Sequence, residues 1–161
     1  MDRRTALARI LAGVIGGELI SRSAFAAGST AAPGIRWQSD LDAAHRLSLE
    51  SNRPTLILFG AAWCTFCKKM DAQTLADPEV VRGVNASFVP VRLDHDREPR
   101  VARVLEVRSL PCTVVLSPEA DLLARIEGFV DAEPYVAALA GARQLQTRIQ
   151  QVRYERVGAA P

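Results

Sequence analysis

The sequence has few cysteines, histidines and aromatic residues, and little excess of either charge. Its 161 residues include three cysteines and two histidines, and aromatic residues make up 6%. The net charge of +2 arises near the N-terminus, because residues 1–26 hold four arginines and two acidic side chains. Residues 27–161 carry 16 charges of each sign and have no long basic stripe. We therefore expect no nucleic-acid partner.

A long apolar run is also absent. The apolar stretch at residues 10–20 has about half of the roughly 20 residues that are needed to cross a bilayer. It follows a basic start at Arg3 and Arg4 and precedes a small-x-small motif at residues 24–26, which is the order of a secretory signal peptide. The adjacent arginines also fit the twin-arginine export route. The alternative is an amphipathic helix that docks on the domain.

The length and composition predict a single globular domain. A chain of 161 residues suffices for one hydrophobic core, and 48% hydrophobic with 24% charged residues is typical of a globular protein. We expect a cleaved signal peptide over residues 1–26, a linker of mostly small residues over 27–36, and a domain over 37–161 that ends in an extended helix. Export by this signal would place the domain in the periplasm.

Helical spacing and apolar runs alternate along this domain. Helices are predicted over residues 40–49, 64–75, 98–106 and 131–157, with a short turn of helix at 77–79. Strands are predicted over residues 55–59, 87–93, 112–116 and 122–127. Strands interleaved with helices favour parallel pairing, and the terminal hairpin adds antiparallel strands. The fold class is therefore α/β, with a central mixed sheet flanked by helices on both faces.

Two cysteines, Cys64 and Cys67, lie where the buried strand at 55–59 leads into a helix. The unpaired N–H groups and partial positive charge of a helix N-terminus favour the thiolate of Cys64, which is the nucleophile in disulfide exchange. Lys68, one turn further on, would support the same charge. We expect Cys64 to be exposed and reactive, and Cys67 to be shielded until it resolves a mixed disulfide.

Other interpretations of this pair are half of a zinc site and a purely structural disulfide. A structural zinc site usually has four protein ligands, and the chain offers only the isolated Cys112, His45 and His95 besides the pair. A structural disulfide between such close cysteines would close very little loop. We expect no metal and no organic cofactor apart from the redox-active Cys64–Cys67 disulfide.

Four segments together carry a family pattern. They are WCTFCK at 63–68, TLADPEV at 74–80, LP at 110–111 and EGFVDAE at 127–133. With them, the sequence resembles the thioredoxin family, and more closely the C-terminal thioredoxin-like domain of DsbD-type periplasmic thiol reductases. The likeness covers about residues 38–140 and implies a thioredoxin fold.

The resemblance also implies roles for residues around the cysteine pair. Leu110 and Pro111 occupy the position of the family's cis-proline, where the backbone of Leu110 would face Cys64 and pair with an extended client segment. An ordinary trans proline at a strand entry is the alternative. A shallow apolar contact surface for substrate is then expected from Trp63, Phe66, Leu110 and Phe129.

The chain departs from the family at Leu58 and in the dipeptide between the two cysteines. The buried aspartate of thioredoxins, six residues before the first cysteine, is Leu58 here. Asp71 matches an acidic position of the DsbD-type domains and would substitute for it, unless it is a solvated carboxylate on the helix face. The dipeptide between the cysteines differs from Gly-Pro, so no redox potential carries over. Cys112 is either a regulatory thiol or, as we expect, a small core residue.

The sequence thus predicts a periplasmic thiol:disulfide oxidoreductase. Cys64 would attack a client protein's disulfide and Cys67 would release the reduced client. Electrons would come from a membrane-borne thiol protein, because the periplasm is kept oxidising. We expect a monomer. The alternatives are a thiol oxidant that donates its disulfide and a non-catalytic thioredoxin-fold binding or assembly module.

Overall fold

The computed structural model describes residues 34–158. The predicted signal peptide and residues 27–33 of the predicted linker lie outside the described residues. Ile35 and Trp37 already pack against the hydrophobic core, and Gln38 forms a bridge with Val91. Within the described part of the chain, no helix is long and apolar enough to span a membrane.

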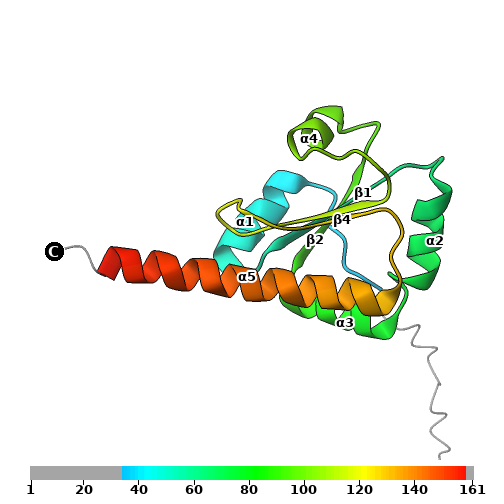
Figure 1. The fold of residues 1–161 in the computed structure, drawn as a ribbon. Coiled ribbons are helices and arrows are strands. Elements are labelled where there is room, and N and C mark those ends of the chain that lie inside the picture. The colour runs from blue at the N-terminus through cyan, green and yellow to red at the C-terminus, as the bar shows by residue number, and fades with distance from the viewer. Residues whose placement is uncertain (1–33, 159–161) are drawn as a thin grey trace, which may run out of the picture. The chain divides into compact units, whose positions relative to one another are not determined.

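Helices and strands are interleaved along the described residues, except that the second helix is followed by the third and the third strand by the fourth (Figure 1). In chain order they are α1 (Leu41–Ser51), β1 (Thr55–Gly60), α2 (Thr65–Gln73), α3 (Pro78–Ser87), β2 (Val89–Asp94), α4 (Pro99–Val104), β3 (Cys112–Leu116), β4 (Leu122–Glu127) and α5 (Ala132–Gly158). The helix start predicted at 77–79 is confirmed, but the predicted length of a short turn is wrong, because α3 has ten residues. Asp77 caps it, and Val80 and Val84 are one turn apart and buried, so packing outweighs the low helix propensity of Gly83.

The four strands form one mixed sheet in the order β2-β1-β3-β4. β1 pairs with β2 in parallel, while β3 is antiparallel to both β1 and β4. The predicted mixed sheet is therefore confirmed. Its central strand β1 is buried on both faces, as a continuous apolar run indicates.

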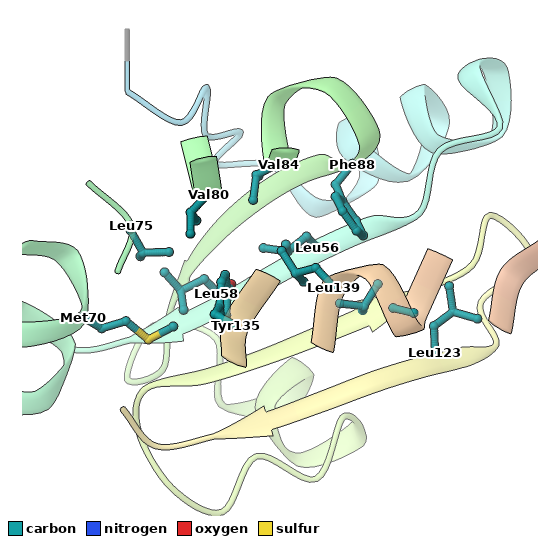
Figure 2. Packing of buried hydrophobic residues seen from close by; sticks show 12 residues of the cluster. Leu56, Leu58, Met70, Leu75, Val80, Val84, Phe88, Leu123, Tyr135 and Leu139 are labelled. Atoms are coloured by element: carbon teal, nitrogen blue, oxygen red, sulfur yellow. The ribbon is translucent and has the colours of Figure 1, made fainter. Parts of the chain in front are cut away.

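Alternate residues of β1 belong to two hydrophobic clusters on opposite faces of the sheet. Leu56 and Leu58 pack with α2, α3 and α5 in the first cluster, which Figure 2 shows. Ile57 and Phe59 pack with α1 and α4 in the second. Burying each such side chain contributes about 1.5–3 kcal/mol of transfer free energy. This two-sided packing fixes β1, and with it the segment that leads into α2.

Ion pairs and a hydrogen bond hold the C-terminal helix α5 against the rest of the domain. Arg153 forms ion pairs with Glu119 at 3.3 Å and with Asp121 at 2.8 Å, in the turn between β3 and β4. Gln150 donates a hydrogen bond of 2.7 Å to the side chain of Asn52, which ends α1 in a left-handed conformation. The helix therefore extends along the domain as a bound element.

Candidate active site at the start of helix α2

The two cysteines close a disulfide at the N-terminus of α2. Cys64 is the N-cap residue, and its sulfur accepts the backbone N–H of Cys67 at 3.1 Å. The Cα atoms of the bonded pair are 5.3 Å apart. Once the disulfide is reduced, the same N–H group and the helix dipole act on the Cys64 sulfur and favour its thiolate.

Exposure does not distinguish the two cysteines. Cys64 is 5% exposed and Cys67 is 6% exposed, so the expectation that Cys64 is an open thiol is wrong for this disulfide form. The helix terminus is a local feature of the chain, whereas the side chains that bury both sulfurs are brought there by the fold. The two sulfurs differ in their position on the helix: Cys64 is at the N-cap, and Cys67 is in the first turn.

The end of β1 lies directly beside the resolving cysteine. A Cβ atom added at Gly60 would lie 3.6 Å from the sulfur of Cys67. The carbonyl of Gly60 also accepts the backbone N–H of His95 at 2.9 Å, which ties the strand end to the segment after β2. The short route from β1 to α2 therefore holds both cysteines against the sheet edge.

Leu110 and Pro111 come to the same edge of the sheet. The antiparallel register places Cys112 opposite Phe59, so the residues before β3 and those after β1 are neighbours. The Leu110–Pro111 peptide bond is cis, and the Pro111 carbonyl accepts the N–H of Gly128 at 2.8 Å. The structure thus brings together the segments that the sequence placed around the cysteine pair.

A cleft of about 420 Å³ lies beside the pair and is lined by Cys67, Lys68 and Asp71. The carboxylate of Asp71 is not a free solvated group, because it forms an ion pair with Arg92 across the cleft. The Arg92 guanidinium also lies 5.5 Å from the centre of the Trp37 ring. Arg92 was not predicted as a site residue, since no local pattern relates it to a residue 21 positions earlier.

Trp63 precedes the reactive cysteine and has a polar anchor. Its indole N–H donates to the Asp96 carboxylate at 2.8 Å, while 67% of the residue remains exposed. This hydrogen bond lowers the pKa of Asp96, and the contact with His95, with Nδ1 3.3 Å from the carboxylate, lowers it further. Neither Asp96 nor His95 was predicted to have a role, because only the fold places them beside the active site.

The other residues of the predicted apolar contact surface differ in solvent exposure. Phe66 is 60% exposed, whereas Leu110 and Phe129 are half-buried. The ammonium of Lys69 lies 3.9 Å from the centre of the Phe129 ring. Thr74, at the end of α2, donates a hydrogen bond to the carbonyl of Val130 and so ties this loop to the helix.

The third cysteine is a core residue, as expected. Cys112 is fully buried in the second hydrophobic cluster. Burial raises the pKa of its thiol to about 11, with a further contribution from Glu127 and an opposing one from Arg125. Its thiolate is therefore not populated at neutral pH. Among residues 34–158, no group of three His, Cys, Asp or Glu side chains is placed to hold a metal ion.

The fold and this site define a thioredoxin-like protein. Residues 41–143 match the family model of the thioredoxin-like domain, and the chain belongs to that family.

Two proteins with Dsb names are similar to this chain in sequence over part of their length. The chain is 29% identical over 107 residues to the thioredoxin-related protein DsbJ of Chlamydia pneumoniae, a match that covers 59% of this chain and 31% of that protein. It is 31% identical over 110 residues to the thiol:disulfide interchange protein DsbD of Ralstonia nicotianae, covering 65% of this chain and 18% of that protein. The chain thus spans less than a third of the length of these two relatives.

A solved structure shows which part of a DsbD protein is similar. The oxidised C-terminal domain of DsbD from Neisseria meningitidis matches with a TM-score of 0.53 and 26% identity. The match covers 63% of this chain and 94% of that domain. The likeness is therefore to one domain of a larger protein.

Proposed function

We propose that this protein is a thiol:disulfide oxidoreductase that reduces the disulfides of client proteins. The observation that carries the proposal is the Cys64–Cys67 disulfide at the N-terminus of α2, on the same sheet edge as Leu110 and Pro111. A helix terminus supplies the electrostatics for a thiolate, and the second sulfur is already within bonding reach.

The reaction runs in two exchanges. The Cys64 thiolate attacks one sulfur of the client disulfide, that bond breaks, and the departing client thiolate takes up a proton. Cys67 then loses its proton, attacks the Cys64 sulfur and restores the protein disulfide, while the second client thiol leaves. Two electrons pass from the protein dithiol to the client, and the Asp71 carboxylate in the same cleft as Cys67 is the proposed support for the proton transfer.

The surroundings of Cys64 favour a reductant over an oxidant. A strong oxidant needs a heavily stabilised thiolate in its reduced form. Here Lys68 is the cation one turn beyond Cys64, while Lys69 lies over Phe129 and Arg92 is paired with Asp71. Thioredoxin at about −270 mV and a strong periplasmic oxidant at about −120 mV differ by roughly 7 kcal/mol, so the two roles are well separated.

The setting that we propose is the periplasm, reached through the signal sequence over residues 1–26. Because that compartment is oxidising, a reductase there needs a membrane-borne thiol protein as its electron donor. The similarity to DsbD, whose name denotes thiol:disulfide interchange, supports a partner of this kind. Leu110 and Trp63 would contact the client, and we propose that the protein acts as a monomer.

Equilibration of the protein with glutathione buffers tests the direction of electron flow. We expect a potential below about −180 mV. A potential near −120 mV, with Cys64 titrating near a pKa of about 4, would mean that the protein donates disulfides. A Cys67→Ser variant should trap clients as mixed disulfides, and a Cys64→Ser variant should trap none. Full activity in cells after loss of both cysteines would instead indicate a binding or assembly module.

A further inference from the structure

Trp37, at the start of the domain, is in contact with a charged residue of the cleft beside the cysteine pair. The guanidinium of Arg92 lies 5.5 Å from the centre of the Trp37 ring, within the range of a cation–π contact. The same guanidinium forms an ion pair with the carboxylate of Asp71. The three side chains therefore form a line of contacts that ends in the cleft where Cys67 lies.

The segment that carries Trp37 is held beside β2 by its backbone. The carbonyl of Gln38 accepts the N–H of Arg92 at 2.9 Å. The N–H of Arg36 donates to the side chain of Asn85 on α3, also at 2.9 Å. Trp37 itself is half-buried and packs against the first hydrophobic cluster. The ring is thus fixed by contacts on both sides of it in the sequence.

Arg92 has no partner of opposite charge on the neighbouring strand. In the parallel register of β1 with β2 it is opposite Leu58, whose side chain has no polar atom. The ion pair with Asp71 is open to solvent, with 39% of the arginine side chain and 41% of the aspartate side chain exposed. Such a pair is weak by itself, because water screens it and both side chains keep other conformations. A ring against the guanidinium restricts those conformations.

We propose that Trp37 is a positioning residue for the resolving step, in which Cys67 attacks the mixed disulfide. It fixes Arg92, and Arg92 holds the Asp71 carboxylate in the cleft. The inference rests on the proposed oxidoreductase function and adds a residue to its second exchange. Cys67 and Asp71 are four residues apart on α2, so they share a face of the helix, and both line the cleft.

The carboxylate acts on the proton of the resolving thiol. Asp71 takes the proton from Cys67, and the thiolate formed attacks the sulfur of Cys64. The bond between Cys64 and the client sulfur breaks, and the proton passes to the departing client thiolate. An aspartate that turns away from the cleft slows this step and leaves the first attack by Cys64 unchanged.

The reaction of the reduced full chain with dithiobis(nitrobenzoate) separates the two steps. Attack by Cys64 releases one coloured thiolate in a phase whose rate rises with the reagent concentration. Resolution by Cys67 releases the second in a phase that is independent of it, and Cys67→Ser should lose this phase. We expect Trp37→Leu to slow only the second phase, about twofold to fivefold, the range of one cation–π contact. Trp37→Phe should keep most of the wild-type rate, because its ring also offers a π face.

A double-mutant cycle tests whether Trp37 acts through Arg92. Arg92→Gln alone should slow the second phase about fivefold to tenfold, and Arg92→Lys should recover much of the rate. Adding Trp37→Leu to Arg92→Gln should slow the second phase no further, because the guanidinium that the ring holds is already gone. Effects that multiply in the double variant would overturn the inference.

Two matched controls separate positioning from loosened packing. Ile35→Ala removes an apolar side chain of the same segment, packed against the same cluster. Arg153→Gln removes an arginine whose ion pairs lie at the turn between β3 and β4. Both should keep the wild-type ratio of the two rates. Equal slowing by Ile35→Ala, or an unchanged second phase in either Trp37→Leu or Arg92→Gln, would overturn the inference and leave the proposed function in place. A wild type without a second phase would overturn the proposed function, and this inference with it.

Discussion

Trp63 and Asp96 are joined by a hydrogen bond of 2.8 Å across 33 residues of sequence. It connects the residue before Cys64 to the segment that follows β2, where the Asp94 carboxylate accepts the N–H groups of Asp96 and Arg97. This bond lowers the pKa of Asp96, so the carboxylate stays ionised and able to accept further into acid solution than an ordinary aspartate. An exposed tryptophan is thereby given a fixed orientation beside the reactive cysteine.

Removing the anchor should weaken client reduction without changing the chemistry at sulfur. Asp96→Ala is expected to slow reduction of a disulfide-linked peptide about threefold to tenfold, because a hydrogen bond to a charged group is lost. Asp96→Asn should recover most of the rate, since its amide oxygen can still accept from the indole. Fluorescence anisotropy in a Trp37→Phe background reports the mobility of Trp63. Wild-type rates and anisotropy in Asp96→Ala would contradict this account.

The two active-site thiols should differ in reactivity although their exposure is nearly the same. In the reduced protein, we expect Cys64 to be alkylated first, with an apparent pKa below the value of about 8.5 for a free thiol, because it caps α2. Alkylation over a series of pH values, followed by mass spectrometry of the peptides, measures this order. Faster modification of Cys67, or a Cys64 that titrates like a free thiol, would show that the assignment is reversed.

The buried third cysteine should matter for stability and not for exchange. Cys112→Ala is expected to lower the free energy of unfolding by about 1 kcal/mol, because a small buried group is removed from the second cluster. Urea unfolding of the oxidised protein measures this loss, and peptide reduction at neutral pH should be unchanged. A fall in rate comparable with that of Cys64→Ser would give Cys112 a catalytic role.

Stability should also fall in alkaline solution. Burial raises the pKa of Cys112 to about 11 and that of Tyr135 to about 12. The neutral forms are therefore favoured in the folded state, and their contribution is complete below pH 9 and lost as the pH rises through the folded values. Between pH 8 and about pH 10.5, the wild type should lose about 1–2 kcal/mol more than Cys112→Ala. Parallel pH profiles for the two proteins would contradict the shift for Cys112.

Much of the fold could be predicted because its signals are local. The apolar run at 55–59 is long enough for a strand and too short for a helix, and it is the buried central strand β1. The length of helix α3 was underestimated, because a glycine and an asparagine interrupt its helical pattern. The apolar residues of that pattern still face the core. The prediction that Cys64 is exposed was wrong, because the burial of a side chain depends on neighbours that are distant in sequence.

The sequence by itself determined the chemistry: two cysteines three residues apart after a buried strand place one sulfur at a helix cap and the other one turn later. That relation involves a single turn of backbone, so spacing suffices to predict it. Only the tertiary structure decided what surrounds the sulfurs. Arg92 pairs with Asp71, and Asp96 holds Trp63, across 21 and 33 residues. Such contacts depend on the parallel pairing of β1 with β2, which brings the end of β2 to the edge where α2 begins.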